Sequence, residues 1–172
     1  MKRYLLFALA TLMLAGFTAG CVGSTKRVAL PKGMNSDIAF LSLGADTTGL
    51  NNDQIALLQK YLTIMDSDMV KRLKNVGFTA SQIKSAKDFK GNGHLLKVKI
   101  TKHKIIPNGA RMFAGMMAGG DVLAAHYELI DSTKKTVLSW DETQASSRNV
   151  YYCIKTLNIH ASDKIASSLS GS

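Results

Sequence analysis

The sequence contains only two cysteines and two prolines among 172 residues, and acidic residues are scarce, with 12 against 22 Lys and Arg. Two cysteines cannot build a multi-bridge disulfide framework or supply all four ligands of a structural zinc site. A hydrophobic content of 46% excludes a disordered tail and a collagen-like repeat. The length allows one ordinary domain with a real core, and the formal charge of that chain is +10.

Common catalytic and nucleotide-binding patterns are missing as well. The four histidines are scattered, without an HExxH motif, and the GNG stretch at 91–93 lacks the third glycine of a dinucleotide fingerprint. Gly120 is followed by Asp and not by the Lys of a phosphate-binding loop. Asp141 and Glu142 are adjacent on an expected strand, so they face opposite sides and cannot act as a carboxylate pair. We expect a non-enzymatic protein without a cofactor or metal.

The N-terminus has the pattern of a secretory signal peptide. Lys2 and Arg3 precede an uncharged apolar run over residues 4–17, and small residues follow up to Cys21. The run is shorter than the ~20 residues of a membrane-spanning helix. We therefore expect residues 1–20 to be removed. Without Lys2 and Arg3 the chain keeps 20 basic and 12 acidic residues, a formal charge of +8, so its basic character belongs to the domain.

The position of Cys21 resembles the lipobox of bacterial lipoproteins, in which the cysteine receives acyl chains such as palmitate and becomes the mature N-terminus. With Val22 rather than Asp after it, the resemblance implies anchoring in the outer membrane, on the periplasmic face. Thr18 stands where the usual lipobox has Leu, and Thr18 and Gly20 also suit ordinary signal peptidase, which would release a soluble chain. A free Cys21 could pair with Cys153, whereas acylation leaves Cys153 as a lone thiol.

Behind the leader we expect a tether and one periplasmic domain. Residues 21–35 mix Gly, Ser, Lys and Pro without apolar periodicity, which is typical of a linker. Residues 36–172 are expected to form the domain. Its first element is a buried strand over 37–43 that breaks at Gly44.

The most regular pattern is a helix over 51–75, with apolar residues three and four apart on one face. Asn51 and Gln54 form a capping box, and Gly77 supplies a stop. Four further elements follow from their periodicity, namely strands over 94–106, 121–131 and 136–146 and a weaker helix over 156–169. The order predicts an α/β fold, an α+β sandwich in which helices pack on one face of a small mixed or antiparallel sheet.

A basic stretch from Lys84 to Arg111 carries eight positive charges against one negative charge. Lys97 and Lys99 share the solvent face of the expected strand, which focuses part of this charge. The functional interpretation is attraction to an unidentified envelope protein or an anionic envelope polymer, phospholipid or lipopolysaccharide. The alternative is a solvated face whose lysines protect an edge strand. Nucleic acid is not expected, because no stacking platform is present.

Residues 108–120, NGARMFAGMMAGG, form a run of small and soft apolar residues between two strands. Its large side chains could form a surface for a partner or lipid, or could pack over the sheet. The candidate partner-binding residues of this segment are Arg111, Met112, Phe113, Met116 and Met117. A second hypothesis therefore has residues 112–120 inserting into a membrane or into a neighbouring protomer.

A third hypothesis is an enzyme that uses Cys153 with His160. The two are seven residues apart, so a helix that starts early enough would place them two turns apart on one side. A cysteine hydrolase also needs an orienting third group. A structural, buried thiol is the expectation.

The segment GARMFAGMMAGG, the strand that ends in Asp131 and the following VLSWDETQAS resemble the bacterial proteins grouped as domain of unknown function 4410. The resemblance covers residues 36–170, with Arg111, Gly115, Gly119 and Asp131 as matching positions, although a Met pair at 116–117 is bulkier than the pattern prefers. It implies an envelope lipoprotein without assigned catalysis. We expect a binding or envelope-assembly module attached to the membrane through Cys21.

Overall fold

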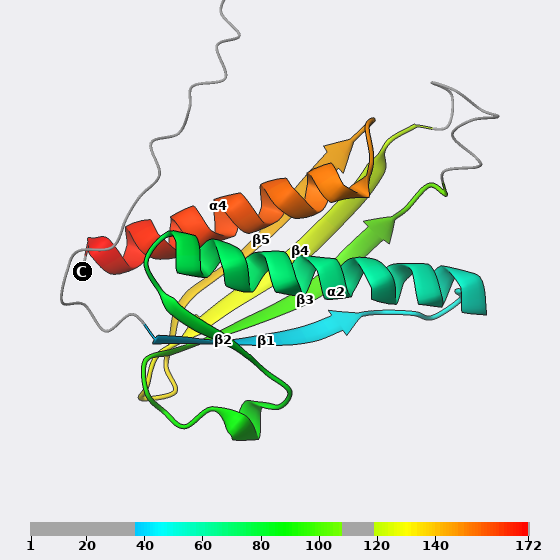
Figure 1. The fold of residues 1–172 in the computed structure, drawn as a ribbon. Helices are drawn as coiled ribbons and strands as arrows, with labels where there is room; N and C mark the ends of the chain where they lie inside the picture. Colours follow the sequence, from blue (N-terminus) through cyan, green and yellow to red (C-terminus); the bar gives the residue numbers. More distant parts are fainter. Residues whose placement is uncertain (1–36, 108–118, 172) are drawn as a thin grey trace, which may run out of the picture.

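The computed structural model describes residues 37–107 and 119–171 and contains one five-stranded sheet in the order β2-β1-β3-β4-β5 (Figure 1). The strands are β1 (Asp37–Ala45), β2 (Thr79–Ile83), β3 (His94–Lys104), β4 (Asp121–Ile130) and β5 (Thr136–Ser146). β1 runs parallel to both of its neighbours, whereas β3, β4 and β5 pair antiparallel. The sheet is therefore mixed.

Two long helices, α2 (Asn52–Asn75) and α4 (Val150–Ser170), pack side by side on one face of this sheet (Figure 1). α2 is the crossover that parallel pairing of β1 and β2 requires. The expected fold class, an α+β arrangement with helices on one face, is confirmed. Among the residues that the structure describes, no helix has the length and apolar character to cross a bilayer.

α2 begins and ends where its sequence predicts. The Asn51 side chain accepts the Gln54 N–H at 2.9 Å, and the Gln54 side chain accepts the Asn51 N–H at 2.9 Å. The helix ends at Asn75, and Gly77 follows with a φ of 108°, a conformation that favours glycine. Its buried residues are Leu58, Met65, Met69 and Leu73. Successive members of this set are four or seven residues apart, which is one or two helical turns, so they form one apolar face.

α4 begins at Val150, and the predicted start at residue 156 was wrong. The side chain of Asn149 caps the helix by accepting the Tyr152 N–H at 3.2 Å. Val150 and Cys153 are buried like Leu157, so the apolar face extends about 1.7 turns further than predicted. Packing on the sheet outweighs the strand preference of the Val-Tyr-Tyr stretch.

Three local features also differ from the sequence prediction. β1 continues to Ala45, and Gly44, with a φ of 72°, lies in a bulge between Ser42 and Ala45. β2 and the short 3₁₀ helix η1 (Ala86–Asp88) were not predicted. β2 is an edge strand of five residues in which only Ala80 is buried, so it has no clear period-2 pattern.

The main core lies between the sheet and the two helices. Tyr127 and Trp140 stack in it with ring centroids 4.7 Å apart. A second, smaller cluster lies on the other face of the sheet and consists of buried Leu41, Leu95 and Ile130. The loop over residues 84–93 carries η1 and lies on the side of the sheet away from α2 and α4 (Figure 1).

Candidate functional site

The sheet face opposite α2 and α4, which we call the open face, carries the lysines of β3. Leu96, Val98 and Ile100 are buried in the main core, whereas Lys97 is half-buried and Lys99 is exposed. Alternation along the strand therefore places the two predicted partner-binding lysines on the open face. β3 is the middle strand of five, so these lysines do not protect an edge strand, whereas the other part of that alternative, a solvated face, stays open.

Lys97 is held in place by an ion pair across two strands. Its Nζ lies 3.1 Å from Oε2 of Glu128, its register partner on β4. The Thr136 hydroxyl donates to the other carboxylate oxygen at 2.8 Å. The hydrogen bond from Thr136, then that from Lys97, holds the pKa of Glu128 below its usual value. Lys97 is thus largely neutralised within the sheet.

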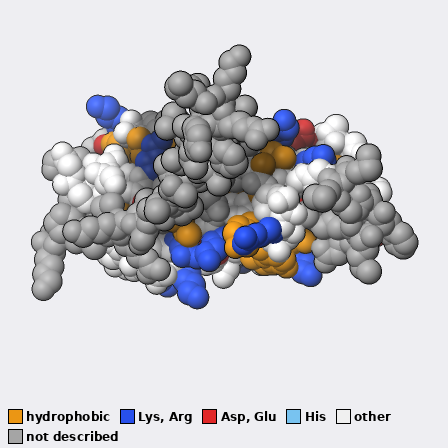
Figure 2. All heavy atoms as spheres, turned by 90° about the horizontal axis from the view of Figure 1, so that it is seen from above, with side chains coloured by type: hydrophobic (Ala, Val, Ile, Leu, Met, Phe, Trp, Pro, Cys, Tyr) orange, Lys and Arg blue, Asp and Glu red, His pale blue; other side chains and the backbone are white. Residues whose placement is uncertain are grey.

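Lys99 begins a row of polar side chains across the open face. It pairs in register with His126, which pairs with Asp141. His126 Nδ1 lies 2.9 Å from Asp141 Oδ1, and both side chains are substantially exposed. Lys102 pairs with Ala124 after a bulge, which returns a second exposed lysine to the same face. Figure 2 views another side of the molecule, from above Figure 1, where the described Lys and Arg side chains are also more prominent than the acidic ones.

At one end of the open face, the 84–93 loop covers part of the second apolar cluster. Phe89 packs on that cluster from the loop. A hollow of about 620 Å³ remains between the loop, β3 and the β4–β5 turn. We call it the basic hollow, and its lining residues are Ala86, Lys87, Phe89, Leu95, Lys97, Ile130 and Lys134.

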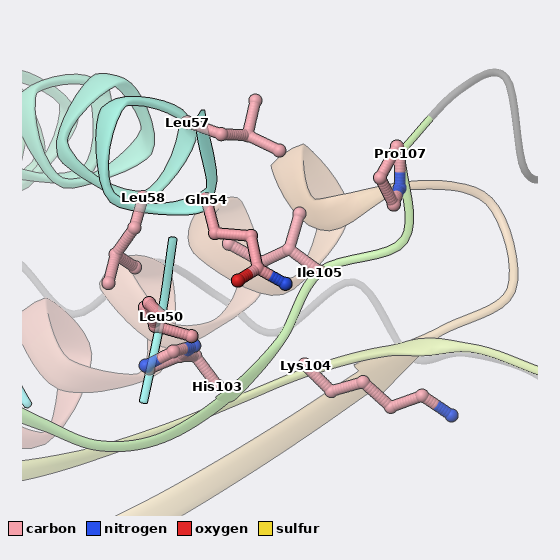
Figure 3. A pocket seen from close by; sticks show the side chains of 8 residues that line it. All are labelled: Leu50, Gln54, Leu57, Leu58, His103, Lys104, Ile105 and Pro107. Atoms are coloured by element: carbon pink, nitrogen blue, oxygen red, sulfur yellow. The ribbon is translucent and has the colours of Figure 1, made fainter. Parts of the chain in front are cut away.

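A second hollow lies at the opposite end of the sheet, between the start of α2 and the end of β3 (Figure 3). Its volume is about 250 Å³, and it is lined by Leu50, Gln54, Leu57, Leu58, His103, Lys104, Ile105 and Pro107. Figure 3 shows the Lys104 side chain extending away from the others. His103 Nε2 lies 3.1 Å from the Asp46 carbonyl oxygen. This hollow adjoins the point where the described chain stops at residue 107.

At this edge a hydrogen bond joins two described residues that flank positions 108–118 in the sequence. Asp121 is buried, and its Oδ1 accepts the Ile106 N–H at 2.7 Å. Five predicted partner-binding residues (Arg111, Met112, Phe113, Met116 and Met117) and the predicted lipid attachment site, Cys21, lie outside the described residues.

Cys153 and His160 both lie in α4, but they do not form a catalytic dyad. Cys153 is 1% exposed, and its Sγ lies 3.7 Å from the Asp121 carbonyl oxygen. His160 is exposed, and its Nδ1 lies 2.6 Å from Glu142 Oε1. Seven residues correspond to about 10 Å along a helix, too far for a proton transfer between the two side chains.

The described residues also contain no group of three or more His, Cys, Asp and Glu that could hold a metal ion. Asp141 faces His126 on the open face, and Glu142 faces His160 on the helix side. The prediction that these two carboxylates point in opposite directions therefore agrees with the structure.

Sequence reasoning missed three features of these sites. Asn158 is buried in α4 and donates to the Met65 carbonyl oxygen at 2.9 Å and to Asp68 at 3.0 Å, which joins the two helices. Asp121 and the covering role of Phe89 were also missed. The sequence offered a signal for Asn158 alone, because this polar residue occupies a position that continues the apolar face of its helix. Asp121 and Phe89 had no comparable signal.

The described residues form an α+β domain with a mixed sheet, one face of which is covered by α2 and α4. The family model described as "Domain of unknown function (DUF4410)" matches residues 41–148, and the chain belongs to this family. The resemblance expected from the sequence is confirmed. No curated protein matches the chain.

Two solved structures share the fold. The PelC dodecamer from Paraburkholderia phytofirmans is 17% identical with a TM-score of 0.50, over 83% of this chain and 93% of that one. A variant of that dodecamer gives 18% identity and a TM-score of 0.51, over 85% and 95%. At this identity the likeness concerns architecture.

Proposed function

We propose that the chain is an outer-membrane-anchored periplasmic lipoprotein and a non-enzymatic binding or envelope-assembly module. Cys21 would hold the lipid, and the open face would bind an anionic envelope component. The observation that carries the proposal is that a central strand presents exposed lysines on the sheet face opposite α2 and α4, the two long helices of the described residues. Lysines on a central strand have no edge to protect, which favours a role in binding.

The charge on the open face is suited to attraction more than to selective recognition. Lys99 and Lys102 are exposed lysines, which act as hydrated point charges without the fixed fork of arginine. Such charges increase the rate of encounter with an anionic partner and respond to salt. We expect binding to weaken as ionic strength rises.

The anchor is tested by labelling cells with palmitate. We expect incorporation into the wild-type chain and its loss, together with release from the membrane fraction, in Cys21→Ser. Cys153→Ser is the matched control and should still be labelled. A wild-type chain without label, or a Cys21→Ser chain that stays in the membrane fraction, would refute the anchored lipoprotein.

The binding face is tested with charge reversal. Lys99→Glu combined with Lys102→Glu should reduce co-sedimentation with lipopolysaccharide, with vesicles that contain phosphatidylglycerol, or with cell-wall sacculi. Lys71→Glu combined with Lys155→Glu reverses two exposed charges on the helices and serves as the control. Equal losses in both double variants would show that net charge, and not the open face, governs binding.

A second candidate is a membrane-active or oligomer-forming subunit that uses residues 112–120. Its support is that the described residues on either side of this segment are joined at one edge of the sheet, by the hydrogen bond from the Ile106 N–H to Asp121. The similar fold of PelC, which was solved as a dodecamer, also favours it. Deletion of residues 112–117 should then change the mass measured by light scattering or the binding to vesicles. An unchanged mass and unchanged vesicle binding would dismiss this candidate.

A further inference from the structure

Three lysines from three different segments line the basic hollow. Lys87 belongs to η1, Lys97 to β3 and Lys134 to the β4–β5 turn. Only Lys97 forms an ion pair with a described acidic residue, through Glu128. Within residues 37–107 and 119–171, Lys87 and Lys134 have no such partner at ion-pair distance. The nearby carboxylate of Asp131 instead accepts hydrogen bonds inside the turn, from Thr133 and from the Lys135 N–H.

The floor and wall of the hollow are apolar. Leu95 and Ile130 are register partners on β3 and β4, and both belong to the second apolar cluster. Phe89 and Ala86 form the wall that the loop contributes. The volume of about 620 Å³ lies within the range of about 300–1,000 Å³ that is typical of small-ligand sites.

We propose that the basic hollow binds a phosphate-headed lipid through one acyl chain. The chain would lie on Leu95 and Ile130 beside Phe89, and the phosphate would lie between the free ammonium groups of Lys87 and Lys134. Lysine binds phosphate as a point charge, so no fixed donor geometry is needed. Two cations beside an apolar floor match an anion that is attached to a hydrocarbon chain. The cations alone would match any anion, and the apolar floor alone would match any hydrocarbon.

The position of the hollow supports a ligand from the membrane. Asp37, where the described chain begins, lies beside the same loop and lines a shallow groove with Asp88, Phe89 and Lys90. β1, β3 and the β4–β5 turn share this end of the sheet, because Ile38 pairs with His94 and Leu95 with Ile130. A chain anchored through Cys21 would therefore enter the domain next to the hollow. This inference rests on the proposed function in one respect only, which is that the lipid would come from the membrane to which Cys21 is anchored.

The test is photo-crosslinking of the full chain, as purified from envelopes, to dodecyl phosphate with a diazirine in its alkyl chain. We expect label in peptides that contain residues 86–97 and 128–134. Unlabelled dodecyl phosphate should compete, whereas inorganic phosphate and dodecyltrimethylammonium at equal concentration should not. Competition by inorganic phosphate as strong as that by dodecyl phosphate would overturn the lipid proposal, and so would equal competition by the cationic amphiphile.

Substitutions at exposed residues test the lysines and the apolar part of the hollow separately. Lys87→Gln with Lys134→Gln should reduce labelling by up to roughly 25-fold, since each of the two exposed charge pairs contributes up to about 1 kcal/mol. Ala86→Leu should occupy part of the hollow beside Phe89 and reduce labelling with all lysines retained. Lys71→Gln with Lys155→Gln, on the helices, should leave labelling unchanged. Labelling that is absent in the wild type, or equal in all of these chains, would refute the proposal.

These outcomes are independent of the anchor. Acylated Cys21 without labelling of the hollow would refute the lipid site and leave the proposed function intact. Labelling of the hollow in a chain that lacks acyl groups would refute the anchored lipoprotein and support the site.

Discussion

The carboxylate of Asp121 accepts the backbone N–H of Ile106 at 2.7 Å, so the first residue of β4 holds the chain just beyond the end of β3. The carbonyl oxygen of the same residue lies 3.7 Å from the Cys153 sulfur in α4. One buried residue thus joins two strands and a helix at the point where residues 108–118 leave the sheet.

Replacing Asp121 with Ala should reduce the free energy of unfolding by about 1–3 kcal/mol, because the half-buried N–H of Ile106 loses its charged acceptor. Urea denaturation followed by circular dichroism measures the change. Asp141→Ala is the control, since the Asp141 side chain is 77% exposed and its removal should cost less than about 1 kcal/mol. Equal effects of the two substitutions would show that the Asp121–Ile106 bond does not stabilise the fold.

Gly93→Ala should be more destabilising than Gly91→Ala. Both glycines have left-handed backbones, with φ of 75° and 78°. A Cβ at Gly93 would lie 2.2 Å from the Asp37 carbonyl oxygen, whereas a Cβ at Gly91 would meet nothing within 4 Å. The Gly91 variant should cost about 1 kcal/mol for backbone strain, and the Gly93 variant more than 2 kcal/mol. The midpoints of thermal unfolding of the two variants measure the difference. Equal decreases in both midpoints would show that the predicted clash with Asp37 does not occur.

Asp66→Asn should stabilise the fold at neutral pH. Burial raises the pKa of Asp66 above its usual value, against the opposing hydrogen bonds from Ser42 and Gln82. The folded chain therefore holds this proton more tightly than the unfolded chain, and its stability falls as pH rises from the unfolded pKa through the folded one. Asn removes that loss, so its advantage over the wild type should be largest at pH 7, shrink as the pH falls through the folded pKa, and stay constant below the unfolded pKa. An advantage that does not vary with pH would contradict this cause.

The thiol of Cys153 should react slowly with Ellman's reagent until the chain is unfolded, because the residue is buried in the main core. An acylated chain should then release one thiol equivalent on unfolding under nonreducing conditions. A chain with a free Cys21 should release two equivalents, or none if Cys21 and Cys153 are joined. Rapid reaction in the folded state would show that Cys153 is accessible and would favour the hypothesis of an enzyme that uses Cys153.

The parts of the fold that the sequence predicts are those with strong local periodicity. The capping box of α2 and the alternation of Lys97 and Lys99 with buried residues are set within a few residues of chain. The strand order and the parallel pairing of β1 depend on contacts far apart in sequence, which periodicity does not encode. The same reason explains why the loop over 84–93 was missed, since Phe89 is a single aromatic without apolar neighbours at a regular spacing.

The parallel pairing of β1 with β3 gives the domain two unlike ends. If Cys21 holds the lipid, the 16 residues from 21 to 36 span about 55 Å at most. The ten residues of β4 separate the two ends by about 34 Å. The end with the basic hollow, where β1 begins, would then lie within about 55 Å of the bilayer. The end where β4 begins could lie farther out, so that one small domain could contact lipid and a more distant partner together.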